Sequence, residues 1–143
     1  NYRMTEMQAA LGVSQMTRLH DFVAKRNALA NRYDDLLKDL PLITPAQIVD
    51  SYSGRHLYVI RLKLNEISLT HKEVFEQLRE NNIGVNLHYI PVHTQPYYQN
   101  LGFKQGQFPN AEEYYCDAIS IPLFHTMTPQ QQQDVIQTLK SII

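Results

Sequence analysis

Two histidines and a tyrosine gather in the stretch "GVNLHYIPVH", which covers residues 84–93. His88 and His93 are two of only six histidines in the chain, and Tyr89 and Pro91 lie between them. Imidazole and phenol groups can bind a metal ion, transfer a proton or hydrogen-bond a ligand. The stretch therefore raises three alternatives, which are a metal site, a catalytic site and an ordinary polar loop.

The spacing of the two histidines argues against a metal site. Structural zinc takes four protein ligands and catalytic zinc three, commonly including two histidines one helical turn apart. His88 and His93 are instead separated by a proline, and no cysteine or aspartate lies beside them. We therefore assign no metal ligand in this chain.

Nucleophilic catalysis also lacks its usual parts. The single cysteine, Cys116, lies in "EEYYCDAIS", where we expect a helix end and a buried thiol that acts as a small hydrophobe. The five glycines are scattered, so no phosphate-binding loop is present. What remains is a group of planar polar side chains bracketed by prolines: His88, Tyr89, His93, Tyr97 and Tyr98. The residue types alone favour a surface loop over a ligand site, because aromatic rings often only bury area.

Asn1 and Arg3 raise a similar question at the start of the chain. Both precede an expected helix, whose N-terminus carries a partial positive charge. An amide and a guanidinium beside that helix end can form an anion site. The alternative is a frayed terminus with a solvated arginine, which the residues alone favour.

Length and composition exclude several classes of protein. A chain of 143 residues fits one domain, and its 13 basic and 14 acidic residues give no reason to expect nucleic acid or an anionic membrane as a partner. No run of about 18 apolar residues is present that would span a bilayer. One cysteine fits a reducing compartment, and we expect a cytoplasmic protein. Because the chain starts at Asn1 and enters a helix almost at once, we expect a piece of a longer polypeptide.

Residues 1–40 have a helical pattern that is too long for one ordinary helix. Thr5 and Gln8 have the spacing of a capping box, and apolar residues recur at helical intervals as far as Leu40. We predict two consecutive helices with a bend between Gln15 and Leu19. Their apolar surface exceeds what the rest of the chain can cover, so we expect it to pack against something outside the chain.

Residues 41–143 mix short strands with helices. Helix starts are marked by capping residues at Thr70 and Thr128. Alternating or short apolar runs predict strands at Leu57–Leu64, Val85–Ile90 and Ala118–Leu123, with a short helix at Asn110–Cys116. The order predicts an α+β fold, in which a small antiparallel sheet is covered by helices on one face and preceded by the long helices.

Four stretches together resemble the C-terminal part of the DegT/StrS family of sugar aminotransferases. They are "NYRMTEMQAALGVSQMTRL", "NNIGVNLHYIPVHTQPYYQNLGF", "FPNAEEYYCDAISIPLF" and "MTPQQQQDVIQTL", and they follow the family's order over essentially the whole chain. The likeness is strongest to the enzymes of the pseudaminic acid pathway. Those enzymes aminate C4 of a UDP-linked 4-keto-6-deoxy-N-acetylhexosamine, usually with glutamate as amino donor.

The resemblance implies a fold-type I enzyme that uses pyridoxal 5'-phosphate (PLP) and works as a homodimer with shared active sites. Residues 1–40 would be bridging and dimer helices, and residues 41–143 the small C-terminal domain. The family's PLP-binding lysine, with the aspartate and the aromatic residue that hold the cofactor ring, precedes the "NYR" motif. No lysine of this chain matches that pattern. We therefore assign no catalytic residue here and expect the segment alone to be inactive.

The resemblance assigns roles to five residues. Asn1 matches the asparagine that reaches the PLP phosphate across the dimer, and Arg3 matches the arginine beside it, which faces the nucleotide sugar. His88 and Tyr89 match the pair that approaches the substrate sugar. His93 matches the second histidine of the motif, and we group it with the substrate-binding residues. The alternative for His93 is that it only braces the loop through a hydrogen bond.

Two functions from different classes follow. The first is the C-terminal segment of a PLP-dependent aminotransferase that makes a 4-amino sugar for surface polysaccharides. The alternative is a stand-alone α+β domain that binds a sugar or a peptide without catalysis.

Overall fold

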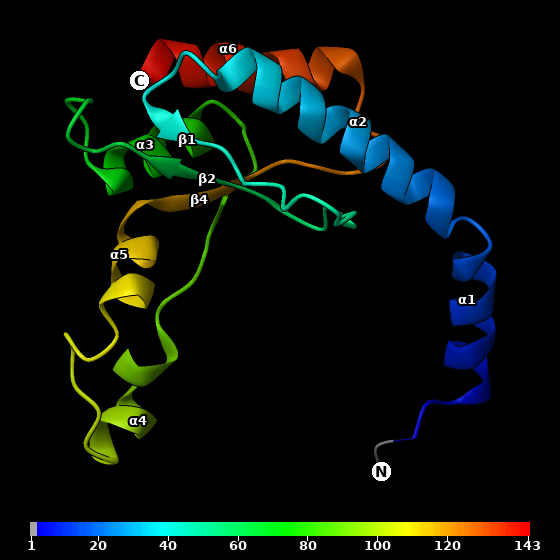
Figure 1. The fold of residues 1–143 in the computed structure, drawn as a ribbon, viewed down its shortest axis with the longest axis horizontal. Helices are drawn as coiled ribbons and strands as arrows, with labels where there is room; N and C mark the ends of the chain where they lie inside the picture. Colours follow the sequence, from blue (N-terminus) through cyan, green and yellow to red (C-terminus); the bar gives the residue numbers. More distant parts are fainter. Residues whose placement is uncertain (1–2) are drawn as a thin grey trace.

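The computed structural model describes residues 3–143, so Asn1 and Tyr2 lie outside the described residues. In Figure 1 the helices α2 and α6 run side by side above a small sheet. One arm descends from the end of α2 and a second arm descends from the sheet. One arm is α1 and the other is formed by α4 and α5. The helices are α1 (Glu6–Met16), α2 (Leu19–Leu37), α3 (His71–Glu80), α4 (Pro96–Asn100), α5 (Pro109–Asp117) and α6 (Pro129–Ile142), with a short 3-10 helix at Val92–Thr94.

The N-terminal helices confirm the prediction of two helices with a bend. Thr5 caps α1 through both bonds of a capping box with Gln8. The chain leaves α1 at Thr17, whose hydroxyl donates to the carbonyl of Ser14 at 2.8 Å, and α2 begins at Leu19. None of the helices in residues 3–143 has the length and apolar character needed to cross a lipid bilayer.

The sheet has four antiparallel strands in the order β1-β2-β4-β3. The strands are β1 (Leu42–Ile43), β2 (Tyr58–Leu62), β3 (Asn86–Leu87) and β4 (Ala118–Ile121). The α+β fold is therefore confirmed. Three predicted strands are present but shorter than expected, and β1 was not predicted. A pairing of two residues depends on its distant partner and leaves no periodicity to detect.

One face of the sheet forms the core. Tyr58 and Ile60 of β2 and Ile119 of β4 are fully buried beneath α2, α3 and α6. Burial of each such side chain stabilises the fold by about 1.5–3 kcal/mol. Tyr33 of α2 is also fully buried, and its hydroxyl donates to the carbonyl of Pro122 at 3.0 Å, which satisfies the phenol inside the core.

The other face of the sheet carries both polar and apolar side chains. Val59 lies opposite Ser120, and Arg61 lies opposite Ala118, so these four side chains share one face. Arg61 reaches from this face to the end of α5 and pairs with Asp117. This contact joins the sheet to the arm that carries α5.

The helix α1 is not part of the core. Within residues 3–143 it has no buried residue, and Met7, Leu11, Val13 and Met16, like Met4 just before the helix, are more than 60% exposed. This exposure agrees with the expectation of apolar surface that the chain does not cover. In α2 the core face includes Leu37, which is fully buried, whereas the adjacent Leu36 is exposed.

Candidate functional site

The predicted site segment leaves the sheet after β3 and descends toward α4 (Figure 1). His88 is half-buried, and Tyr89 is 71% exposed. Pro91 is buried and caps the 3-10 helix at Val92–Thr94, which turns His93 inward until only 8% of it is exposed. The segment therefore presents Tyr89 to solvent and buries His93.

The helix α5 holds the ring of His88. Tyr114 meets the His88 ring edge-on, with 6.0 Å between the ring centroids. On the same tyrosine, the Arg61 guanidinium lies 5.6 Å from the ring centroid. Burial raises the pKa of Tyr114; the charge of Asp117 also raises it and that of Arg61 lowers it. The phenol therefore remains neutral at physiological pH and stacks as an uncharged ring.

Arg61 is fixed by two parallel hydrogen bonds to Asp117. Its Nε donates to Oδ1 at 2.8 Å and its Nη2 to Oδ2 at 2.7 Å, and Glu113 accepts a further bond at 3.0 Å. These bonds, with that to Asp117 foremost, raise the pKa of Arg61. Glu113 and Asp117 stand one helical turn apart, so α5 presents both carboxylates to one strand residue. The result is a fixed guanidinium that supports Tyr114 and, through it, His88.

Glu112, also on α5, holds His93. The His93 Nε2–H donates to Glu112 Oε1 at 2.8 Å. The same carboxylate accepts from the backbone N–H of Gly106, at 2.7 and 2.9 Å to its two oxygens, and of Phe108 at 3.4 Å. Desolvation raises the pKa of Glu112, but the bonds from His93, Gly106 and Phe108 outweigh it and lower the pKa. Glu112 thus ties the histidine to the loop that precedes α5.

Sequence reasoning missed all four of these supporting residues: Arg61, Glu112, Tyr114 and Asp117. The acidic pair Glu113 and Asp117 on one face of a helix was a usable signal, because such a pair favours a cationic partner. The identity of that partner, a strand residue more than fifty positions away, was not available from local spacing.

Arg3 lies apart from the histidine segment. It is exposed just before α1, at the foot of one arm, whereas residues 88–93 lie on the other arm (Figure 1). Asn1, the predicted cofactor contact, lies outside the described residues. The structure therefore brings His88, Tyr89 and His93 together in one segment but does not bring Arg3 to them.

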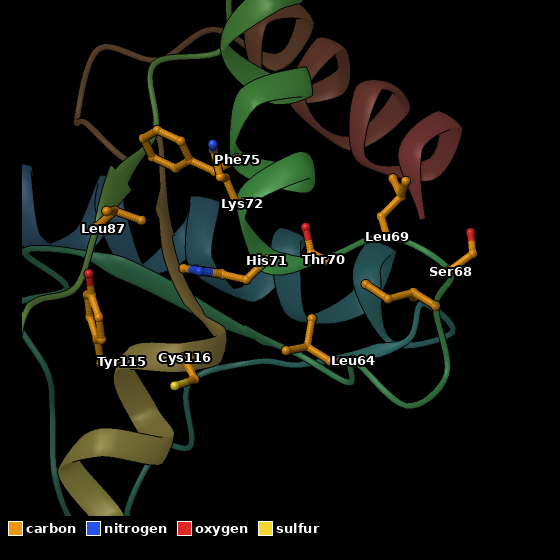
Figure 2. A pocket seen from close by; sticks show the side chains of 11 residues that line it. Leu64, Ser68, Leu69, Thr70, His71, Lys72, Phe75, Leu87, Tyr115 and Cys116 are labelled. Carbon is orange, nitrogen blue, oxygen red and sulfur yellow. The ribbon is translucent and has the colours of Figure 1, made fainter. Parts of the chain in front are cut away.

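A pocket of about 750 Å³ lies between the start of α3 and the end of α5 (Figure 2). Its wall is mostly apolar, with Leu69, Phe75 and Leu87 among its lining residues. Its imidazole, His71, lies 3.1 Å from the carbonyl oxygen of Ala118 and is engaged in that contact. Of the predicted site residues that the structure describes, neither Arg3 nor His88, Tyr89 or His93 lines this pocket, so we place the site at the histidine segment rather than here.

Cys116 corrects one prediction. The thiol was expected to be buried as a small hydrophobe, but it is exposed at the end of α5 and borders the pocket. In Figure 2 its sulfur points away from the His71 ring. The helix end was placed correctly, but the half-buried residues Glu112 and Asp117 of α5 face His93 and Arg61, and Cys116 lies on an exposed side of the helix.

Comparison with known protein families decides where this chain belongs. Residues 1–140 match the DegT/DnrJ/EryC1/StrS aminotransferase family. The chain is a member of this family. Its resemblance to sugar aminotransferases, inferred from four sequence stretches, is thereby confirmed.

Individual relatives of this chain agree with its assignment to the aminotransferase family. The spore coat polysaccharide biosynthesis protein SpsC of Bacillus subtilis is 39% identical over 143 residues, which cover 98% of this chain and 37% of that protein. A UDP-4-amino-4,6-dideoxy-N-acetyl-beta-L-altrosamine transaminase of Campylobacter jejuni is 34% identical, over 100% of this chain and 38% of that protein. The chain thus spans little more than a third of these relatives.

A solved structure of the same family supports the fold. Helicobacter pylori PseC, an aminotransferase involved in the biosynthesis of pseudoaminic acid, superposes with a TM-score of 0.89 at 28% identity. The match covers 99% of this chain and 38% of that one. The arrangement of helices around a small sheet is therefore also found in that aminotransferase.

Proposed function

We propose that this chain is the C-terminal segment of a PLP-dependent aminotransferase acting on a nucleotide-linked 4-keto-6-deoxy sugar. The product is the 4-amino sugar, the amino donor is glutamate, and the enzyme is a cytoplasmic homodimer that serves surface-polysaccharide synthesis of the pseudaminic acid type. The names of the Campylobacter relative and of PseC support the substrate class. SpsC supports a role in polysaccharide synthesis.

The observation that carries the proposal is the bracing of the His88 ring by Tyr114 of α5, with Tyr89 exposed beside it. Tyr89 is exposed, and the His88 ring, held against Tyr114, makes no hydrogen bond to another residue in the part of the chain that the structure describes. An imidazole and a phenol in such positions can donate to and accept from sugar hydroxyls and a keto oxygen. We propose these two residues as the sugar contacts and His93 as a residue whose bond to Glu112 fixes their segment.

Arg3 suits the phosphate of a cofactor or a nucleotide. Its guanidinium is exposed and forms no ion pair within residues 3–143. It also lies just before the N-terminus of α1, where backbone N–H groups and the helix dipole favour an anion. We propose that Asn1 and Arg3 serve the active site of the partner subunit. PLP, when bound, supplies the electron sink for moving the amino group.

The lysines of the chain support a cofactor-binding lysine elsewhere. Lys25 and Lys72 pair with acidic residues one helical turn away, and Lys63 pairs with Glu66. Lys38, Lys104 and Lys140 are exposed. A lysine that forms a covalent link to a cofactor is commonly activated in a desolvated pocket or beside another cation, and none of these lysines is buried within residues 3–143. We therefore propose that the catalytic lysine lies in the larger part of the protein, before Asn1.

Kinetics of the full-length enzyme test the proposal. His88→Gln and Tyr89→Phe should raise KM for the nucleotide sugar or lower kcat/KM by at least about tenfold, which corresponds to about 1.4 kcal/mol. The reaction of the cofactor with glutamate alone should be unchanged, because that half-reaction involves no sugar. His20→Gln, an exposed histidine of α2, is the matched control. Unchanged sugar kinetics in both site variants would remove these residues from the site.

The proposal that the catalytic lysine lies outside residues 1–143 has a separate test. Full-length protein should show the visible absorbance of bound PLP, and residues 1–143 alone should show none. Cofactor absorbance from the segment alone would place the lysine in this chain. Absence of transaminase activity in the full-length protein, with retained sugar binding, would instead support a binding domain without catalysis.

A further inference from the structure

Arg55 is a buried cation that has no counter-charge in the part of the chain the structure describes. Only 6% of the residue is exposed, and its Nε has no hydrogen-bond partner. Within residues 3–143 no carboxylate forms an ion pair with it, although Arg61 nearby in the chain pairs with two. Buried charges in folded proteins are ordinarily paired, because desolvation of an unpaired charge is costly. The partner of Arg55 is therefore missing from the described chain.

The backbone at Arg55 is also unusual. Its φ of 45° lies in the left-handed region, which residues with a side chain rarely adopt. Such conformations persist where the surrounding structure imposes them, and they concentrate at functional sites. Here the backbone N–H of Arg55 donates to the hydroxyl of Ser53 at 3.1 Å, which holds the turn that directs the side chain inward.

An acidic group that shares a neighbour with Arg55, Asp34, is already engaged. Asp34 of α2 accepts a hydrogen bond from the hydroxyl of Tyr58. Burial and the bond to Asp34 raise the pKa of Tyr58, while the positive charge of Arg55 lowers it. Arg55 and Asp34 therefore both act on the Tyr58 phenol, but they form no ion pair with each other within residues 3–143.

Arg55 lines a cavity of about 450 Å³ in the loop between β1 and β2. The polar residues of the wall include one cation and no acidic side chain: Gln47, Ser51, Ser53, Arg55 and His56. Gln47 Nε2 donates to the carbonyl and the hydroxyl oxygens of Ser51, at 2.8 and 2.6 Å, so the loop around the cavity is ordered by its own bonds. Guanidinium, hydroxyl and imidazole groups together match the oxygens of a carboxylate or a phosphate.

We infer that Arg55 anchors a binding site for the oxyanion of a small ligand, a carboxylate or a phosphate. The site stands on the burial, the missing partner and the cavity, and it does not depend on the proposed reaction. Its assignment to a substrate does rest on the proposed function. That reaction uses two anionic substrates, an amino acid with a carboxylate and a nucleotide sugar with phosphates, and either supplies the required group.

Thermal unfolding of the full-length protein tests the site without measuring activity. An anion that binds only the folded state raises Tm by mass action. Wild-type protein should gain Tm with inorganic phosphate or with acetate, beyond the effect of chloride at matched ionic strength. Arg55→Met should reduce that gain to what a phosphate site at Arg3 contributes, and a gain equal to that of wild type would overturn the inference. Arg79→Met, an exposed arginine at the end of α3, should retain the full gain and serves as the matched control.

The same variant separates a small ligand from a carboxylate supplied by another part of the protein. If Arg55 is unpaired in the free protein, Arg55→Met should have a Tm equal to or above that of wild type in chloride, because the variant removes an uncompensated buried charge. A lower Tm in chloride together with no anion response in wild type would overturn the inference, since Arg55 would then have a protein partner. Should Arg55→Met fail to fold, Arg55→Lys keeps the charge but loses the planar fork, and we expect its affinity for the stabilising anion to be at least tenfold weaker.

The relative size of the Tm responses to phosphate and to acetate identifies which substrate supplies the oxyanion. A saturable response to phosphate and UDP, with none to acetate or glutamate, assigns the site to the nucleotide sugar. A saturable response to acetate and glutamate alone assigns it to the amino donor. Linear, non-saturating changes with every salt would overturn the site.

Discussion

The His93 Nε2 atom lies 2.8 Å from Glu112 Oε1, and the same carboxylate holds the backbone of Gly106. One side chain of α5 therefore fixes both the inner histidine of the site segment and the loop that leads into α5. Because His93 is almost fully buried, its position determines how Tyr89 and His88 leave the sheet. The bonds that Glu112 accepts from His93 and Gly106 explain how a short segment without regular secondary structure can present two side chains in a fixed direction.

Glu112→Gln should make the protein less stable at neutral pH and remove part of its acid sensitivity. The folded-state pKa of Glu112 is lowered below the ordinary 4.5, so its carboxylate stabilises the fold above that pH. The contribution is lost as pH falls through the lowered pKa. The Tm difference between wild type and variant should therefore be largest near neutrality and shrink below about pH 4.5.

Glu113→Gln is the control for that measurement, because Glu113 is a neighbouring carboxylate with a 72% exposed side chain. Its Tm difference from wild type should be small at neutral pH. A Glu112→Gln variant whose Tm difference from wild type did not change with pH would show that Glu112 does not stabilise the fold through the charge of its carboxylate.

Asp117→Asn should weaken the attachment of α5 to the sheet. The change replaces one acceptor of the two parallel bonds to Arg61 and leaves the guanidinium partly unpaired. Bonds between charged groups contribute about 1.5–3 kcal/mol, and the partial exposure of Arg61 reduces this, so we expect a loss of about 1–2 kcal/mol. Urea denaturation measures it. Glu113→Gln, which removes the more exposed partner, should cost less than about 0.5 kcal/mol, and equal losses would contradict the assignment.

Tyr114 should act as a positioning residue for the sugar. Tyr114→Leu removes the ring that meets His88 and carries Arg61, whereas Tyr114→Phe keeps it. Such ring contacts contribute about 1 kcal/mol each, so the leucine variant should raise KM for the nucleotide sugar by about three- to tenfold. The phenylalanine variant should resemble wild type. KM for glutamate should stay constant in both, and a parallel rise would indicate general damage rather than positioning.

The sequence was most informative where structure is decided locally. The capping boxes at Thr5, Thr70 and Thr128 all form, because the two bonds of each box join residues three apart. The strand β1 was missed because its two residues are extended only through their pairing with Leu62 and Arg61. The supports of the site were missed for the same reason, since each joins α5 to a distant segment. Patterns of local spacing can mark a helix face but cannot identify the partner across the fold.

The glutamine tract Gln130–Gln133 shows this limit within four residues and provides the last prediction. Gln132 is fully buried, and its amide donates to the carbonyl of Leu29 at 2.7 Å and accepts from Arg32 at 3.0 Å. Gln132 therefore joins α6 to α2 above the sheet (Figure 1). Gln132→Ala leaves these groups unsatisfied and should cost about 2–3 kcal/mol in the free energy of unfolding. Gln130→Ala, which changes an exposed side chain of the same helical turn, should cost less than about 0.5 kcal/mol. Denaturant unfolding of both variants measures the contrast, and equal costs would show that the α2–α6 contact does not depend on the buried amide.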